Sequence, residues 1–114
     1  MKGYMYILEC ADQSFYVGST YDLIVRIDQH QRGEGSNYTN ERLPVKLIYY
    51  EEFETVGEAF RREKQIQGWS RAKKIALMKK NYNQLHELAA CLNNSHSNRF
   101  EFEKAIKARI EASQ

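Results

Sequence analysis

A short polar break separates two strand-like runs at the start of the chain. Residues 4–10 and 15–18 are rich in aromatic and apolar side chains, and residues 11–14 between them read Ala-Asp-Gln-Ser. Parallel neighbours need a crossover connection of about a dozen residues or more, whereas antiparallel strands can be joined by a tight turn. The sequence therefore predicts an antiparallel hairpin, and the strands of this chain cannot all be parallel.

Signals for a helix and a third strand follow the hairpin. A first helix is predicted over residues 21–31, and glycines at 33 and 35 end it. The side chains that can accept hydrogen bonds from its first backbone amides are Ser19, Thr20 and Asp22. A polar loop through residue 40 then leads to residues 45–53, whose β-branched and aromatic side chains favour a strand.

Two more helices are predicted after the third strand. Thr55 and Glu58 fit a capping box, in which a hydroxyl and a carboxylate bind backbone amides of the first turn. The helix that they open should run over residues 56–67 and stop at Gly68. Residues 71–80 are expected to form the next helix, so the order of elements is β-β-α-β-α-α.

This order of elements is typical of a small α+β domain. We expect a three-stranded antiparallel sheet flanked by helices in residues 1–80, and a helical C-terminal extension in residues 81–114. Residues 100–112 of the extension have helical composition. Three alternatives stay open for them: they dock on the domain, they fray, or they bind another copy of the chain or a protein partner.

Composition excludes several classes of protein. Hydrophobic residues make up 42% of the chain and charged residues 28%, which is typical of a globular domain and not of a disordered chain. No apolar run approaches the roughly 20 residues that span a bilayer, so no membrane association is expected. Cys10 and Cys91 form no CxxC pair, which argues against a zinc site or a disulfide framework and favours a cytoplasmic location.

Positive charge is concentrated in one block of the sequence. Residues 61–80 hold eight basic residues and one acid, Glu63, whereas residues 1–60 hold five basic and ten acidic residues. A basic block can attract the phosphates of nucleic acid. The same pattern is also typical of a solvated helix surface, so charge alone leaves both interpretations open.

The single acid of the basic block falls in an apolar helical stripe. The stripe comprises Val56, Ala59, Phe60, Glu63 and Ile66. An ionised carboxylate is costly to bury unless it is paired or bound to a cation. Arg26 or a nearby tyrosine could pair with Glu63, and a divalent metal could bind it, because hard cations prefer carboxylate oxygens. A metal-dependent phosphodiesterase needs a carboxylate that binds the cation and basic residues that neutralise the charge of the substrate phosphate.

Other polar residues fall where core residues are expected. Arg26 and His30 lie one turn apart on the apolar face of the first helix, so their side chains can converge. They could equally lie at the edge of that face, with Arg26 reaching water. Tyr6 and Tyr16 lie on strands that should be neighbours and could present hydroxyls to one face, although strand tyrosines are usually packing residues.

Taken in order, these residues resemble the GIY-YIG nuclease superfamily. Its pattern is a Gly-Ile-Tyr strand, a Tyr-Ile-Gly strand, an arginine on the first helix and a glutamate on a later helix. Residues 4–6 stand at the first motif and residues 16–18 at the second. Arg26 and His30 stand on the first helix, and Glu63 follows the third strand.

The resemblance covers residues 3–80 and is greatest to the stand-alone, single-domain bacterial members, which end soon after a basic helix. Residues 61–66 and 69–74 look typical of that subgroup. Two positions depart from the pattern. Tyr4 replaces the glycine of the first motif, and Ser19 stands where some members carry a lysine that can contact phosphate.

The resemblance implies a divalent-metal-dependent endonuclease that hydrolyses phosphodiester bonds of DNA, with a role in DNA repair or recombination. Glu63 would hold Mg²⁺ or Mn²⁺, and Tyr6 would take a proton from the attacking water. Tyr16 would orient the water or a phosphate oxygen, and Arg26 would stabilise the charge that develops on the phosphoryl oxygens. Three roles stay open for His30: phosphate contact, proton relay and protonation of the leaving oxygen.

Six further residues are expected to contact DNA. They are Gly18, Arg61, Arg62, Lys64, Lys73 and Lys74. One alternative is a catalytically weak or inactive nucleic-acid-binding protein that keeps the nuclease fold. Another is a protein-interaction module that pairs through its C-terminal helix.

Overall fold

The computed structural model describes residues 1–80 of the chain. The strands are β1 (Gly3–Glu9), β2 (Phe15–Thr20) and β3 (Lys46–Phe53); the helices are α1 (Leu23–Gln31), α2 (Asn37–Asn40), α3 (Val56–Gln67) and α4 (Arg71–Lys80). The predicted α+β class and three-stranded antiparallel sheet are confirmed. The extension predicted at 81–114 lies outside the described residues.

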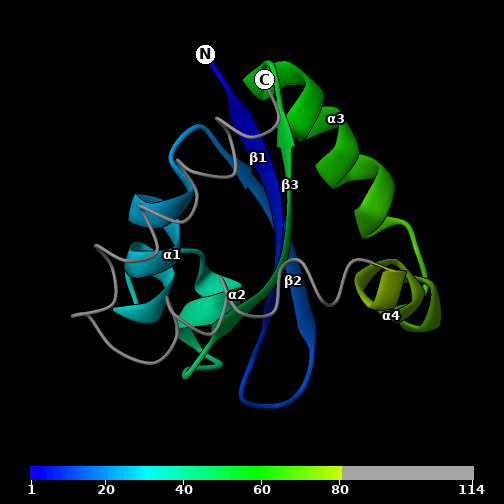
Figure 1. Ribbon diagram of the computed structural model, residues 1–114. Coiled ribbons are helices and arrows are strands. Elements are labelled where there is room, and N and C mark those ends of the chain that lie inside the picture. Colours follow the sequence, from blue (N-terminus) through cyan, green and yellow to red (C-terminus); the bar gives the residue numbers. More distant parts are fainter. Residues whose placement is uncertain (81–114) are drawn as a thin grey trace.

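The sheet has the order β2-β1-β3, with β1 in the centre and both neighbours antiparallel to it. Figure 1 views the sheet nearly edge-on, with α1 and α2 on one face and α3 on the other. Because side chains alternate along a strand, Tyr6 of β1 points to the opposite face from Met5 and Ile7. All three are buried, so β1 forms the middle of the core.

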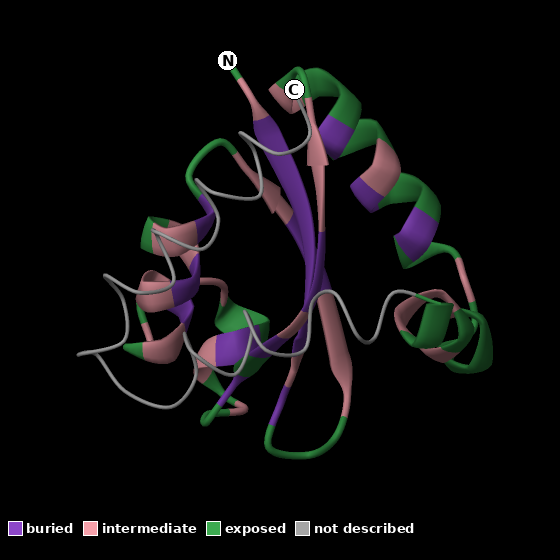
Figure 2. Cartoon of the chain, in the orientation of Figure 1, coloured by how far each residue is buried: buried purple, intermediate pink, exposed green. Residues whose placement is uncertain are grey.

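Helices α1 and α3 begin at the predicted caps. The Asp22 carboxylate accepts a hydrogen bond from the Val25 amide at the start of α1, and the Thr55 hydroxyl accepts one from the Glu58 amide at the start of α3. Figure 2 shows the buried positions of both helices turned toward the sheet. The prediction was wrong for Phe60, which is 50% exposed. The buried stripe of α3 is too narrow to include it, since successive helical residues are rotated by about 100°.

Helix α2 occupies a segment for which the sequence predicted a loop. It is a single turn whose N-terminal cap is the Ser36 hydroxyl, which accepts a hydrogen bond from the Thr39 amide. Thr39 is fully buried and points toward α1. A helix of one turn is too short to show a periodic pattern in the sequence, yet it places the Thr39 hydroxyl in the core. In residues 1–80, no helix has the length and apolar character required to cross a membrane.

Candidate active site

The side chain of Tyr6, on the central strand β1, extends over the neighbouring edge strand β2. It can do so because the residue of β2 that pairs with Tyr6 is a glycine. The register pairs Tyr6 with Gly18 of β2. A Cβ atom at position 18 would lie 2.5 Å from Tyr6 Oη and 2.6 Å from Cζ, inside van der Waals contact. Gly18 therefore leaves the space that the buried Tyr6 ring occupies. The role of this glycine in the described structure is close packing.

We expect Gly18→Ala to displace the Tyr6 ring and to lower the free energy of unfolding by about 1–3 kcal/mol, the usual cost of overpacking a core. Urea denaturation would measure the change. Gly57→Ala is the matched control, because a Cβ there would meet only Thr55 Oγ1, at 3.9 Å. A Gly18→Ala variant as stable as the wild type would contradict the packing role.

His30 bridges Tyr6 and Thr39 inside the core. Its Nε2 is 2.8 Å from Tyr6 Oη, and its Nδ1 is 2.8 Å from Thr39 Oγ1. The Thr39 hydroxyl donates its own hydrogen to the Ser36 carbonyl, so it accepts from His30 Nδ1–H. The other nitrogen, Nε2, then carries no hydrogen and accepts the Tyr6 hydroxyl. The contact of the Thr39 hydroxyl with the Ser36 carbonyl favours the Nδ1–H tautomer of His30.

Burial controls the protonation states of this pair. Burial and, as a smaller effect, the positive charge of Arg26 together lower the pKa of His30 from 6.5 to about 4. Burial raises the pKa of Tyr6 strongly, an effect that Arg26 opposes and that Tyr16 and Glu63 reinforce. At neutral pH, His30 is therefore neutral and Tyr6 keeps its hydroxyl hydrogen.

The low pKa of His30 predicts a pH-dependent stability. Between pH 6.5 and about 4 the unfolded chain binds a proton at His30 that the folded chain does not. The stability that His30 contributes is therefore fully present above pH 6.5 and is lost as pH falls toward 4, by roughly 3 kcal/mol at ~1.4 kcal/mol per pKa unit. We expect this slope in urea denaturation across that window and a flatter slope in His30→Gln. Equal slopes in the two proteins would contradict it.

Glu63 lies on the other face of the sheet, next to the edge strand. Its Oε1 accepts a hydrogen bond from Ser19 Oγ at 2.6 Å, and its Oε2 accepts one from Gln67 Nε2 at 2.9 Å. Ser19 is adjacent to Gly18, so the two positions face opposite sides of β2. Since β2 is an edge strand, the two sides of the sheet meet there. The negative charge of Glu63 raises the pKa of Tyr6, although burial is the main cause of the increase.

Tyr16 completes a cluster of rings around His30. The centroid of the Tyr16 ring lies 5.2 Å from that of His30 and 6.4 Å from that of Tyr6. Arg26 is half-buried, and its Nη1 donates to Gln29 Oε1 at 3.2 Å. A side-chain hydrogen bond from Arg26 and, after it, the charge of Arg26 lower the pKa of Tyr6, and the same charge lowers the pKa of His30. The structure thus brings Tyr6, Tyr16 and His30 into contact, with the charges of Arg26 and Glu63 acting on Tyr6.

The basic residues of α3 that were predicted to contact DNA differ in whether they already form ion pairs within the protein. Arg62 forms a two-pronged ion pair with Glu51, with Nε–Oε1 at 2.8 Å and Nη2–Oε2 at 3.2 Å. Lys64 is exposed, and its Nζ lies 3.5 Å from Glu63 Oε2. Arg61 is exposed on the same helix. Of these three, Arg61 and Lys64 are the better placed for a phosphate.

The basic residues of α4 lie beyond the end of α3. Lys73 is exposed and its Nζ lies 4.2 Å from the centroid of the Trp69 ring, while Lys74 is half-buried. Arg62 contacts the same indole, with its guanidinium 5.2 Å from the ring centroid. Trp69 therefore joins the two helices through cation–π contacts.

The site offers one carboxylate to a cation. Within residues 1–80 there is no group of three or more His, Cys, Asp or Glu side chains that could enclose a metal ion. Mg²⁺ is commonly bound through one or two carboxylates, with water and substrate phosphate as the other ligands. The single Glu63 carboxylate, next to the Ser19 hydroxyl, fits such a site and does not fit a site built wholly from protein side chains.

Four residues of this site carry contacts that the sequence analysis did not predict. They are Ser19, Gly35, Thr39 and Gln67. Gln67 follows Glu63 by four residues, and this spacing is a detectable signal for a contact on a helix. Gly35 lies against the His30 ring, where a Cβ would collide with it. The other three residues contact Glu63 or His30, which lie on other elements of the fold. Nothing in the sequence around Ser19, Gly35 and Thr39 predicts these contacts.

Comparisons with known proteins agree with this architecture. The family model of the GIY-YIG catalytic domain matches residues 2–81. UPF0213 proteins of Staphylococcus aureus strains are 43% identical over 76 residues, which are 67% of this chain and 93% of theirs.

Two solution NMR structures are also similar to the chain. The UPF0213 protein of Bacillus halodurans is 42% identical, with a TM-score of 0.47, over 69% of this chain and 84% of that one. A protein of E. faecalis is 35% identical, with a TM-score of 0.51, over 74% of this chain and 90% of that one.

Proposed function

The chain belongs to the GIY-YIG catalytic domain family of nucleases, and from this premise we propose that it is a divalent-metal-dependent endonuclease that hydrolyses DNA, with a role in repair or recombination. One observation carries the proposal. The Tyr6–His30 pair and the Glu63 carboxylate approach the same edge strand from opposite faces, through Gly18 and Ser19. The two sets of groups therefore flank β2, and the charge of Glu63 acts on Tyr6 across it.

Tyr6 serves as the base in this proposal, and His30 directs it. The Tyr6 hydrogen points at His30 Nε2, so the lone pairs of Oη remain for a water molecule. As water attacks phosphorus, one of its O–H bonds breaks and the proton moves to Oη, while the Tyr6 proton moves to Nε2. Because the pKa of His30 is about 4, the imidazolium is transient and returns its proton as the leaving oxygen departs. Of the three roles left open for His30, its burial favours proton relay.

Arg26 and Tyr16 act on charge and position. The Arg26 guanidinium lowers the pKa of Tyr6, which favours the transfer of its proton. The same charge stabilises the phosphoryl oxygens as they become more negative. Tyr16, packed against His30 and Tyr6, orients the attacking water or a phosphate oxygen.

Glu63 would hold the Mg²⁺ or Mn²⁺ ion in this site. When bound, such an ion neutralises phosphate charge and makes a coordinated water more acidic. Ser19 and Gln67 fix the carboxylate through hydrogen bonds, so its orientation does not depend on the ion. Exposed Lys64 lies beside it and can contact a phosphate of the strand.

A cleavage assay tests the proposal. The full chain is incubated with labelled single-stranded, duplex, nicked and branched DNA, with Mg²⁺, with Mn²⁺ and with a chelator. We expect cleavage of at least one substrate with either ion and none with the chelator. Cleavage that persists with the chelator would refute metal dependence, and the lack of cleavage on every substrate would refute the nuclease activity.

The second candidate is a nucleic-acid-binding protein without efficient turnover. One observation favours it: both Glu63 oxygens already accept hydrogen bonds from the protein, so the carboxylate is satisfied without a cation. This protein would bind DNA in the same assay, and it would leave every substrate intact with either ion.

DNA binding by α4 can be tested through its salt dependence. If Lys73 and Lys74 contact phosphates, their replacement by Ala should weaken binding about equally on all sequences, because phosphate contacts do not read bases. The slope of log affinity against log salt should flatten by about 0.9 for each duplex DNA phosphate that the variant no longer neutralises. Fluorescence anisotropy at several salt concentrations would measure both effects.

The matched control replaces Lys2 and Lys46, whose ammonium groups pair with Glu52 of β3 and Glu9 of β1. An affinity and salt slope that match the wild type in the Lys73/Lys74 variant would assign these two lysines to the solvated surface. Phosphate binding would then fall to Arg26, Arg61 and Lys64.

A further inference from the structure

A row of planar side chains leads from the Tyr6–His30 pair to the loop after α2. Next to His30 lies Tyr16, whose ring stacks on that of Tyr38 with centroids 6.1 Å apart and planes 28° apart. The guanidinium of Arg42 then lies 3.8 Å from the centroid of the Tyr38 ring, a close cation–π contact. Tyr38 thus links an arginine outside the site to a tyrosine inside it.

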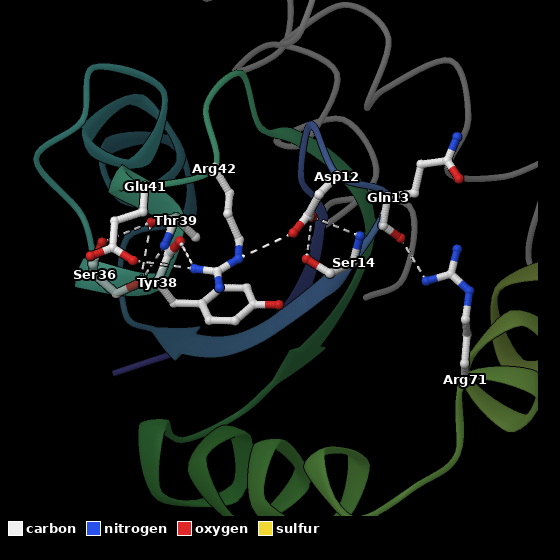
Figure 3. Close-up of polar contacts among 9 residues, drawn as sticks. All are labelled: Asp12, Gln13, Ser14, Ser36, Tyr38, Thr39, Glu41, Arg42 and Arg71. Atoms are coloured by element: carbon white, nitrogen blue, oxygen red, sulfur yellow. Dashed lines mark hydrogen bonds and ion pairs between the residues drawn. The ribbon is translucent and has the colours of Figure 1, made fainter.

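Arg42 is held in place by the hairpin loop and by its own segment. Its Nε donates to Asp12 Oδ2 at 3.2 Å, and its Nη1 donates to the Tyr38 carbonyl at 3.0 Å. Figure 3 shows Arg42 above the Tyr38 ring and reaching across to Asp12. The other Asp12 oxygen accepts from the amide and the hydroxyl of Ser14, two residues before Tyr16.

The same short segment also sets the position of His30. Thr39, next to Tyr38 in α2, accepts the hydrogen of His30 Nδ1. Two rings of the site, Tyr16 and His30, are therefore both positioned from neighbouring residues of α2. A displacement of about 1 Å in a reacting group can cost about 10²-fold in rate, so such support affects turnover.

We propose that Tyr38 and Arg42 are positioning residues, which hold the Tyr16 ring in the orientation that the reaction needs. Tyr38 acts through its ring and Arg42 acts by fixing that ring against Asp12 and the hairpin loop. This inference rests on the proposed function. The Tyr38 ring contacts Tyr16 and Arg42, so its contacts within the described residues connect the site to the hairpin loop.

Enzyme kinetics and NMR spectra of four full-length variants test the inference. The variants are Tyr38→Leu, Tyr38→Phe, Arg42→Gln and, as the matched control, Arg32→Gln. Arg32 is also an ion-paired arginine, bound to Asp28 and Glu34. For each protein, kcat and KM are measured on the cleaved DNA, and the Tyr16 ring signals are recorded in two-dimensional ¹H–¹³C spectra.

We expect Tyr38→Leu to lower kcat by about tenfold and Arg42→Gln by about threefold, with KM within about twofold of the wild type, because position changes and substrate binding does not. Tyr38→Phe keeps the ring and should restore kcat to within about twofold. The Tyr16 signals should shift in Tyr38→Leu and Arg42→Gln, and they should be unchanged in Arg32→Gln.

Several outcomes would overturn the inference. If Tyr38→Phe loses as much activity as Tyr38→Leu, the hydroxyl matters and the stacked ring does not. If KM rises while kcat holds, Tyr38 contacts DNA. Tyr16 signals that do not move in Tyr38→Leu would remove the positioning role whether or not DNA is cleaved. If the wild type cleaves no DNA and those signals still shift, the nuclease proposal fails and the positioning of Tyr16 stands.

Discussion

Glu63→Gln is expected to abolish metal-dependent cleavage while it preserves the fold and the binding of DNA. The amide cannot supply the anionic oxygen that a divalent cation requires. We expect the cleavage rate at fixed Mg²⁺ concentration to fall by roughly 10²–10³-fold or more, the usual effect of removing a group that stabilises transition-state charge. Single-turnover cleavage measures this loss, and fluorescence anisotropy measures DNA affinity.

The hydrogen bonds around Glu63 explain why this variant should fold. A glutamine oxygen can accept from Gln67, and its amide nitrogen can donate to Ser19, so both present partners remain satisfied. Glu54→Gln removes the same charge at an exposed position just before α3 and serves as the control. Cleavage by Glu63→Gln at the wild-type rate and equal metal concentration would rule out the proposed metal ligand.

Tyr6→Phe is expected to lower the cleavage rate by about 10²–10⁴-fold, the range that a positioned acid or base contributes. The phenyl ring keeps the packing against Gly18, so the lost group is the hydroxyl alone. The variant also leaves His30 Nε2 without its donor in the core. An unsatisfied buried acceptor costs about 1–3 kcal/mol, so the melting temperature should fall as well.

Tyr4→Phe separates the chemistry of Tyr6 from general effects on stability. Tyr4 is a buried tyrosine on the same face of β1, and its ring centroid lies 6.4 Å from that of Tyr50. The control should keep its activity to within about twofold when folded protein is compared. If Tyr6→Phe loses less than about fivefold and Tyr16→Phe loses far more, the base is Tyr16 and the proposed roles are exchanged.

Much of the fold could be predicted from local pattern. The four-residue break after residue 10 indicated a hairpin, and capping at Asp22 and Thr55 indicated where α1 and α3 begin. Helical spacing predicted that Leu23, Arg26, Ile27 and His30 share one face. Of these four residues, Arg26 is half-buried and the other three are buried. These features are set by residues within one turn or one strand of each other, so the sequence contains them directly. The four-residue helix α2 was missed because it is too short for any period.

The candidate site could be predicted as a set of positions and not as a set of contacts. Glu63 stood out as an acid in an apolar stripe, and it is buried, but its partners are Ser19 and Gln67 where Arg26 or a tyrosine was considered. Arg62 matched a phosphate-binding pattern, yet it is paired with Glu51 of β3. The contact between Arg62 on α3 and Glu51 on β3 depends on how the helix packs on the sheet, so the sequence alone did not predict it.

The sequence by itself determined the α+β class, the antiparallel hairpin, the helix starts and the list of polar residues at core positions. These depend on turn length, capping chemistry and periodicity, all of which act over short distances along the chain. Only the tertiary structure decided which groups meet. The Tyr6–His30 bond joins residues 24 positions apart and the Ser19–Glu63 bond joins residues 44 apart. Such contacts depend on strand register and helix placement. The protonation states of Tyr6 and His30 follow from burial, so the tertiary structure determined them as well.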